Sequence, residues 1–183
     1  AVGFNSMMLS TNEIITDVNG VQTLIESLPY YNTALGAYSL YQNDTSNNTA
    51  IGYKSQFTSE TGNYNTSLGS CTLENLLDGS NNVAIGYLSM NLKTGSNNVS
   101  VGTMSLQNNN NGEDNVSIGY YSMNSTTGDK NIAIGTYALP VTTTDDNVAI
   151  GHSSLKKSTD ATENVTLGSR TLTENISGSQ NVA

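Results

Sequence analysis

Charged side chains are scarce in this chain of 183 residues, and most of those present are acidic. Charged residues make up 11% of the sequence, against about a quarter in an ordinary globular protein. The 15 acidic and 6 basic residues give a formal net charge of −9. Because that charge repels nucleic acid backbones and anionic membrane surfaces, we expect neither as a partner.

Cysteine and histidine are represented by one residue each, Cys71 and His152. One cysteine provides no intrachain disulfide and no cysteine-based metal site, and one histidine leaves no second imidazole to complete such a site. No stretch approaches the roughly 18 consecutive apolar residues of a membrane-spanning helix, so we expect no membrane insertion. We therefore expect a protein that is not an enzyme, with no catalytic residues, no cofactor and no metal.

The clearest feature of the sequence is an internal repeat. The segments NNVAIGYLSM (81–90) and DNVSIGYYSM (114–123) share seven of their ten letters. Aligning the chain on the glycine of this motif gives core glycines spaced 16 or 17 residues apart, at Gly36, Gly52, Gly69, Gly86, Gly102, Gly119, Gly135, Gly151 and Gly168. The same step leads back to Gly20 and Gly3, so the predicted number of units is eleven.

Fixed positions flank each core glycine. Asparagine stands four residues before it, a small residue two before and an aliphatic residue one before. Serine, threonine or alanine follows three residues after, and leucine or methionine four after, except at Gln56. The structural repeat residues that represent this pattern are Asn48, Ile51, Gly52, Asn82, Ile85, Gly86, Asn115, Ile118, Gly119, Asn147, Ile150 and Gly151.

The length of the unit indicates the fold. Sixteen or seventeen residues are too few for a helical hairpin or a propeller blade, which need roughly 34 to 45. The residues from the asparagine to the glycine alternate between larger and small side chains, which is the period of a strand. We predict an all-β fold, a parallel β-solenoid of about eleven coils stacked roughly 4.8 Å apart. Residues 1–31 would form degenerate coils and residues 32–183 the regular array.

The small side chains leave a flat strand surface, which either the opposite wall of a thin coil or a neighbouring subunit must approach. We expect a core of two or three aliphatic side chains per coil and a ladder of asparagine side chains at a turn corner. Because so small a coil buries little apolar surface by itself, we also expect the chain to form oligomers.

The position directly after the core glycine alternates between large and small residues, so successive tyrosines would lie two coils apart. It holds Tyr53, Ser70, Tyr87, Thr103, Tyr120, Thr136 and His152. Aromatic side chains suit contacts with sugars and protein ligands. The candidate ligand-facing residues are Tyr53, Tyr87, Tyr120, Tyr121 and Tyr137.

Acidic pairs occur in the connectors, at Glu113-Asp114 and Asp145-Asp146. Carboxylates of neighbouring coils are potential Ca²⁺ ligands. Their spacing matches neither an EF-hand nor the nonapeptide calcium repeat, so a solvated charged edge is the favoured interpretation.

The units NNVAIGYLS, DNVSIGYYS and DNVAIGHSS resemble the YadA-like head repeat of trimeric autotransporter adhesins, N-x-V-A-I-G-x-x-S. The units NTALGAYSL (32–40) and NTAIGYKSQ (48–56) resemble the N-T-A-(L/I)-G-x-x-(S/A)-L repeat of phage and large-virus fibres. The resemblance covers roughly residues 32–183. The adhesin family implies a left-handed parallel β-roll and a side-by-side homotrimer.

These resemblances imply two functions. The first is a non-enzymatic structural shaft of a trimeric viral or phage surface fibre, which positions a host-attachment tip. The alternative is a bacterial trimeric autotransporter adhesin head whose solenoid wall itself binds host matrix or glycan. Both imply an extracellular place on a virion or bacterial cell surface. The partners would be further copies of the chain, flanking fibre or anchor domains, and a host receptor, matrix protein or glycan. Because a solenoid needs caps and none is recognisable, we expect this chain to belong to a longer array.

Overall fold

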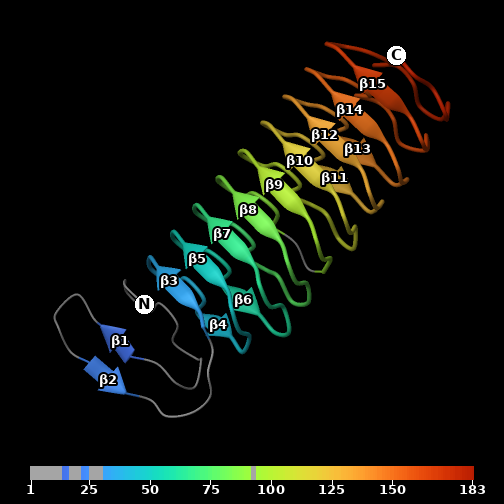
Figure 1. The fold of residues 1–183 in the computed structure, drawn as a ribbon. Coiled ribbons are helices and arrows are strands. Elements are labelled where there is room, and N and C mark those ends of the chain that lie inside the picture. Colours follow the sequence, from blue (N-terminus) through green and yellow to red (C-terminus); the bar gives the residue numbers. More distant parts are fainter. Residues whose placement is uncertain (1–13, 17–21, 25–30, 92–93) are drawn as a thin grey trace.

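A computed structural model describes residues 14–16, 22–24, 31–91 and 94–183, and Figure 1 shows residues 31–91 and 94–183 as a rod of stacked coils. All regular secondary structure in these ranges is β-strand. The strands are β1 (Ile14–Thr16), β2 (Gln22–Leu24), β3 (Thr33–Leu35), β4 (Gln42–Asn43), β5 (Thr49–Ile51), β6 (Thr58–Ser59), β7 (Thr66–Leu68), β8 (Val83–Ile85), β9 (Val99–Val101), β10 (Val116–Ile118), β11 (Ser125–Thr126), β12 (Ile132–Ile134), β13 (Val141–Thr142), β14 (Val148–Ile150) and β15 (Val165–Leu167).

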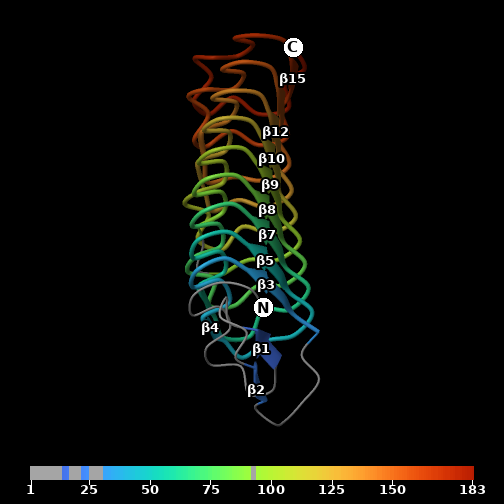
Figure 2. The ribbon, with the colours of Figure 1, turned by 90° about the vertical axis from the view of Figure 1, so that its left-hand side faces the viewer.

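Nine of these strands form one parallel sheet along the rod, in the order β3, β5, β7, β8, β9, β10, β12, β14, β15. Each repeat contributes one strand, and equivalent residues pair in register, for example Val83 with Val99 and Ile85 with Val101. Figure 2 shows these strands aligned in a single column. The parallel β-solenoid with a step of 16 or 17 residues is thereby confirmed.

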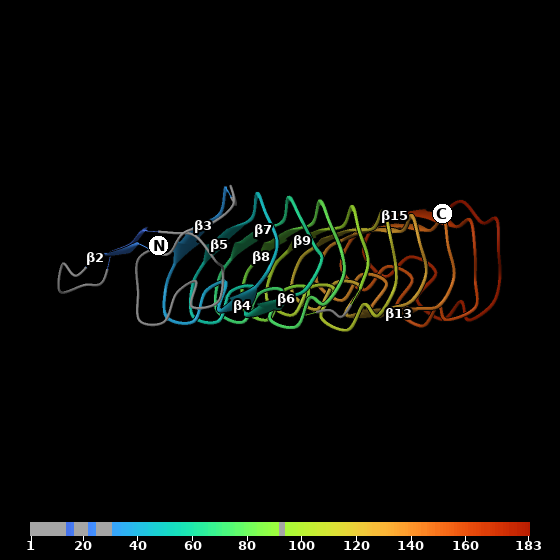
Figure 3. The same cartoon turned by 90° about the horizontal axis from the view of Figure 1, so that it is seen from below.

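A second wall closes each coil, as Figure 3 shows for β4, β6 and β13. Its regular pairing is shorter, because β4 pairs with β6 and β11 pairs with β13, both in parallel. Single parallel bridges, such as the one between Asp78 and Thr94, continue this wall between those pairs. Hydrogen bonds from coil to coil on both walls therefore hold the rod together.

The described residues form fewer coils than the eleven predicted for the whole chain. The nine-stranded sheet contains eight steps from one coil to the next, whereas the sequence suggested about eleven coils. In the region assigned to degenerate coils, β1 pairs with β2 in an antiparallel manner, which no stacked parallel coil does. The expected core glycines Gly3 and Gly20 lie outside the described residues.

The interior of each coil is lined by the small residues, not by the aliphatic residue next to the glycine. In every described strand of the sheet the middle residue is buried while its two neighbours point outward, as in Val83, Ala84 and Ile85 of β8. Inside the coil, the small strand residues face hydroxyl groups of the turn that follows the core glycine, and Ser55 Oγ, for example, donates to Ser67 Oγ at 2.7 Å. Turn residues of the same chain therefore closely approach the small side chains.

A column of large side chains fills the remaining interior space beside the small residues, and Leu76 adds a second large apolar side chain in its coil. The side chains of the column lie four residues after the core glycine and are fully buried at Leu40, Leu73, Met90, Leu106, Met123, Leu139 and Leu155. Gln56 is buried in the same column, and neither its Nε2 nor its Oε1 has a hydrogen-bond partner.

The predicted asparagine ladder is present and buried. The backbone N–H of Asn82 donates to Oδ1 of Asn65 at 2.9 Å, and Nδ2 of Asn82 donates to the carbonyl oxygen of Gly95 at 2.9 Å. The backbone N–H of Asn98 in turn donates to Oδ1 of Asn82 at 3.0 Å. Each asparagine is therefore linked to the coil before it through its backbone N–H and to the coil after it through its side-chain amide, and this amide satisfies backbone groups that would otherwise be buried without partners.

Candidate interaction surfaces

The outer face of the nine-stranded sheet carries two rows of side chains that are mostly aliphatic, and we call it the aliphatic face. The first row is Thr33, Thr49, Thr66, Val83, Val99, Val116, Ile132, Val148 and Val165. The second row is Leu35, Ile51, Leu68, Ile85, Val101, Ile118, Ile134, Ile150 and Leu167. Every one of these residues is half-buried or exposed.

The aliphatic face is continuous. Eight steps between nine strands give it a length of about 40 Å. Within it, Leu35 and Leu68 are 46% and 45% exposed. Monomeric soluble proteins rarely leave continuous apolar patches larger than a few hundred square ångströms in contact with water, and such patches mark association sites.

The opposite wall is polar on its outside. Outward positions there hold Gln42, Asp44, Thr58, Glu60, Asn75, Asn108, Asn110, Thr127 and Thr143, with Leu77, Val141 and Ile176 as apolar exceptions. An exposed ion pair joins Lys157 Nζ to Glu174 Oε2 at 2.6 Å in this region. The rod therefore has two chemically different faces.

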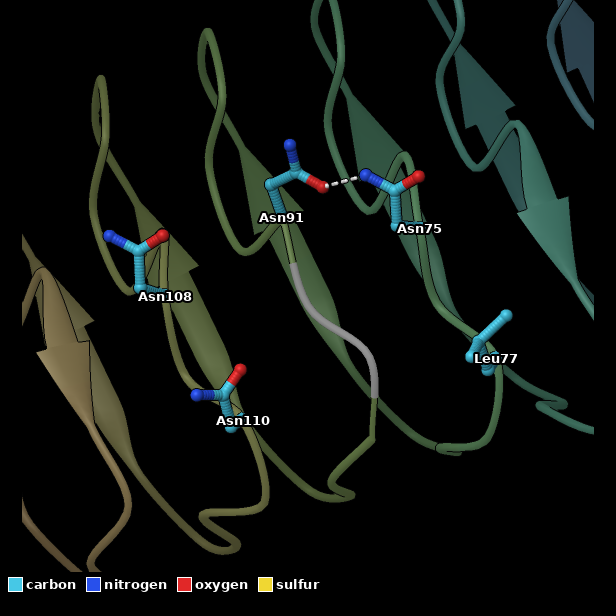
Figure 4. Close-up of a pocket in the computed structure, with 5 residues that line it drawn as sticks. All are labelled: Asn75, Leu77, Asn91, Asn108 and Asn110. Atoms are coloured by element: carbon cyan, nitrogen blue, oxygen red, sulfur yellow. Dashed lines mark hydrogen bonds between the residues drawn. The ribbon is translucent and has the colours of Figure 1, made fainter.

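An amide-lined groove of about 420 Å³ lies on the polar side, and Figure 4 shows its lining residues. Nδ2 of Asn75 donates to Oδ1 of Asn91 at 2.8 Å across neighbouring coils. Asn108, Asn110 and Leu77 complete the described lining. Sequence reasoning missed this groove, and its only signal was asparagine recurring five or six residues after successive core glycines.

Aromatic residues at the corner after the core glycine form what we call the aromatic row: Tyr53, Tyr87, Tyr120 and His152. The three tyrosines are 49%, 49% and 45% exposed, and His152 is also exposed. The coil stacking places Tyr53, Tyr87 and Tyr120 two coils apart, as the alternation predicted. Tyr121 and Tyr137 occupy the neighbouring column and are half-buried.

Rings of the neighbouring column support the exposed tyrosines. Tyr120 contacts Tyr137 edge to face, with ring centroids 5.6 Å apart, and lies 5.3 Å from Tyr121. A hydrogen bond with Tyr137 raises the pKa of Tyr120 above its ordinary value. Tyr53 makes a similar edge contact with Tyr38 at 6.1 Å. Two aromatic clusters therefore lie along one corner of the rod.

Lys54 and Cys71 lie beside the first aromatic cluster. Lys54 Nζ lies 3.1 Å from Glu74 Oε1, and this hydrogen bond raises the pKa of Lys54. Burial raises the pKa of the half-buried Cys71 thiol. A raised pKa lowers the fraction of Cys71 that is the nucleophilic thiolate at neutral pH.

The acidic connectors take part in coil stacking. The backbone N–H of Glu113 donates to Oδ1 of Asp129 at 2.8 Å, and that of Asp129 donates to Oδ1 of Asp145 at 2.8 Å. Among the described residues, no group of three or more histidine, cysteine, aspartate or glutamate side chains is arranged to hold a metal ion. Within the same residues, no helix has the length and apolarity to cross a membrane.

The predicted repeat residues fall into three structural classes. Asn48, Asn82, Asn115 and Asn147 belong to the buried ladder, while Ile51, Ile85, Ile118 and Ile150 lie on the aliphatic face. Gly52, Gly86, Gly119 and Gly151 stack backbone against backbone between coils. The asparagines and glycines therefore hold the coils together, while the aliphatic residues form part of the outer surface.

Comparison with protein-family models, curated proteins and solved structures found no match for this chain. The surfaces described above are therefore the basis for the function proposed next.

Proposed function

We propose that this chain is a non-enzymatic structural shaft that associates with further copies of itself through the aliphatic face, as part of an extracellular surface fibre. The observation that carries this proposal is the outward orientation of the aliphatic residue in every repeat. A solenoid that existed alone would expose this strip to water along its whole length. Packing of several copies removes it from water, at about 25 cal/mol for each square ångström buried.

A homotrimer is the assembly that we propose, with the aliphatic faces directed toward a shared axis. The polar wall would then remain on the outside, since it is the opposite side of the coil, and the aromatic row would lie at the corner beside the aliphatic face. This arrangement supports a role in which regular repeats set the length of a fibre on a virion or a bacterial cell. Flanking fibre or anchor domains would supply its attachment and its tip.

Small-angle X-ray scattering combined with sedimentation equilibrium tests the shaft. The proposal predicts an elongated particle whose mass is three times the chain mass of 19.3 kDa. A folded single chain at every concentration, or a compact particle, would contradict it.

A second function has an observation in its favour. In the bacterial adhesin alternative, the wall of the solenoid itself binds host matrix or glycan, and the exposed clusters around Tyr53 and Tyr120 are suited to such contacts. Capture of the chain on immobilised matrix proteins and glycans would support this alternative. Failure to bind at high chain concentration would leave only the shaft.

A further inference from the structure

The aromatic row has a spacing that coil stacking fixes. Hydrogen bonds from the next coil hold the backbone at each position, since the N–H of Cys71 donates to the carbonyl oxygen of Tyr53 at 2.9 Å. The N–H of Leu88 donates to the carbonyl oxygen of Ser70 at 3.1 Å, which completes the two steps from Tyr53 to Tyr87. Successive rings therefore stand about two coil rises apart, roughly 10 Å.

The rings of the row are too far apart to contact one another. Paired aromatic rings have centroids within about 7 Å, and the contacts of Tyr53 and Tyr120 are made with the neighbouring column. Stacking within the row therefore does not explain why an aromatic residue returns in every second coil. Nearly half of each tyrosine surface stays exposed.

The coils between the rings carry short side chains. Ser70, Thr103 and Thr136 occupy the same column and provide hydroxyl groups in place of rings. A ligand lying along the row would meet ring, hydroxyl, ring and hydroxyl in turn. Such a surface is suited to a polymer whose successive units alternate in the face that they present.

We propose that the aromatic row binds an extended, uncharged β-1,4-linked polysaccharide laid along the rod axis. In such a chain each sugar is turned over relative to the previous one, so the same apolar C–H face recurs at every second sugar. The length of two such sugars is close to two coil rises. The net charge of −9 disfavours anionic polysaccharides. This inference does not depend on self-association, because it uses the corner after the core glycine and not the aliphatic face.

Isothermal titration calorimetry of the full chain with soluble oligosaccharides tests the proposal. Cellohexaose and chitohexaose represent two β-1,4-linked chains with different substituents, and maltohexaose provides an α-1,4-linked chain that curves. We expect at least one β-1,4-linked hexaose to bind, and to bind at least about tenfold more tightly than its disaccharide, because it reaches several aromatic anchors. Absence of binding by both, or equal binding of maltohexaose, would overturn the proposal.

Single-residue variants distinguish binding at the aromatic row from nonspecific binding to any exposed tyrosine. Tyr87→Ala removes the central ring and should weaken hexaose binding by about tenfold, while Tyr87→Phe keeps the ring and the binding. Tyr64→Ala is the matched control, because Tyr64 is 62% exposed but lies outside the row. Equal losses in Tyr87→Ala and Tyr64→Ala would overturn the proposal.

A register variant tests the spacing itself. The double substitution Ser70→Tyr and Tyr87→Ser keeps the number of tyrosines but moves one ring by a single coil. We expect it to bind hexaose about as weakly as Tyr87→Ala, with unchanged circular dichroism. Binding equal to that of the original chain would show that spacing is irrelevant and would overturn the proposal.

Discussion

A methyl group placed on Gly102 would lie 2.4 Å from the carbonyl oxygen of Gly119 in the next coil. The φ angle of Gly102 is also +135°, a backbone conformation that residues other than glycine rarely adopt. Both the approach of the neighbouring backbone and the local conformation therefore require glycine here. Equivalent contacts recur along the column of core glycines, so backbone packs directly against backbone from coil to coil along this column.

Gly102→Ala should lower the free energy of unfolding by more than about 4 kcal/mol, because a rigid backbone atom blocks the added methyl group. Gly168→Ala is the matched control, since Gly168 has a φ of +137° but its nearest contact is a threonine methyl group at 3.2 Å. We expect the control to lose only the conformational part, about 1–2 kcal/mol. Urea denaturation measures both values, and equal losses would contradict the stacking explanation.

Asn82→Ala should destabilise the chain by about 2–5 kcal/mol. The substitution leaves the carbonyl oxygen of Gly95 and the N–H of Asn98 buried without these partners. Asn110→Ala provides the comparison, because Asn110 is exposed on the polar wall and its replacement should change stability by less than about 0.5 kcal/mol. Similar losses of stability in the two variants would show that the hydrogen bonds of the ladder do not stabilise the chain more than an exposed asparagine does.

Gln56→Leu should stabilise the chain by about 1–3 kcal/mol, since two buried polar atoms without partners are replaced by the side chain found elsewhere in the column. Gln42→Leu, at an exposed position of β4, should have little effect on thermal or urea denaturation. A lower stability of Gln56→Leu would mean that Gln56 has a role that its surroundings do not reveal.

Tyr137→Phe should return the pKa of Tyr120 toward its ordinary value, because it removes the hydrogen bond that raises it. The folded chain holds the Tyr120 proton more tightly than the unfolded chain. Its contribution to stability is therefore fully present below the ordinary tyrosine pKa of about 10 and is lost as the pH rises through the raised pKa. An NMR titration of the Tyr120 ring resonances measures the shift, and an unchanged pKa in the variant would exclude Tyr137 as the cause.

The period of the coil and the parallel stacking were predictable from sequence, because one asparagine, one small residue and one glycine recur at a fixed distance. The asparagine ladder followed from the same recurrence. Which face of the strand is buried could not be predicted from the sequence, since alternation identifies two faces without saying which one points into the coil. In most domains the side of Ile85 would be the core, whereas in β8 the small Ala84 points inward and Ile85 points outward.

Two further features left little trace in the sequence. Tyr38 and Leu40 have φ angles of 60° and 49°, and such left-handed corners recur at residues that rarely adopt them. They are imposed by the closure of the coil and not by local preference. The antiparallel pairing of β1 with β2 was missed because Thr23 and Leu24 happen to fit the repeat register. For the surfaces, the alternating tyrosines were visible at once, but the amide groove required the stacked coils.

Sedimentation equilibrium of the double variant Ile85→Asn and Ile118→Asn tests the central claim most directly, namely that the aliphatic face joins copies of the chain. Each substitution removes an apolar contact of about 1.5–3 kcal/mol from the proposed interface, while both side chains lie outside the coil. Val141→Asn, on the opposite wall, is the control. We predict trimers for the original chain and the control, and mostly folded single chains for the double variant. An original chain that sediments as a folded monomer, or a double variant that sediments like the original, would contradict the account.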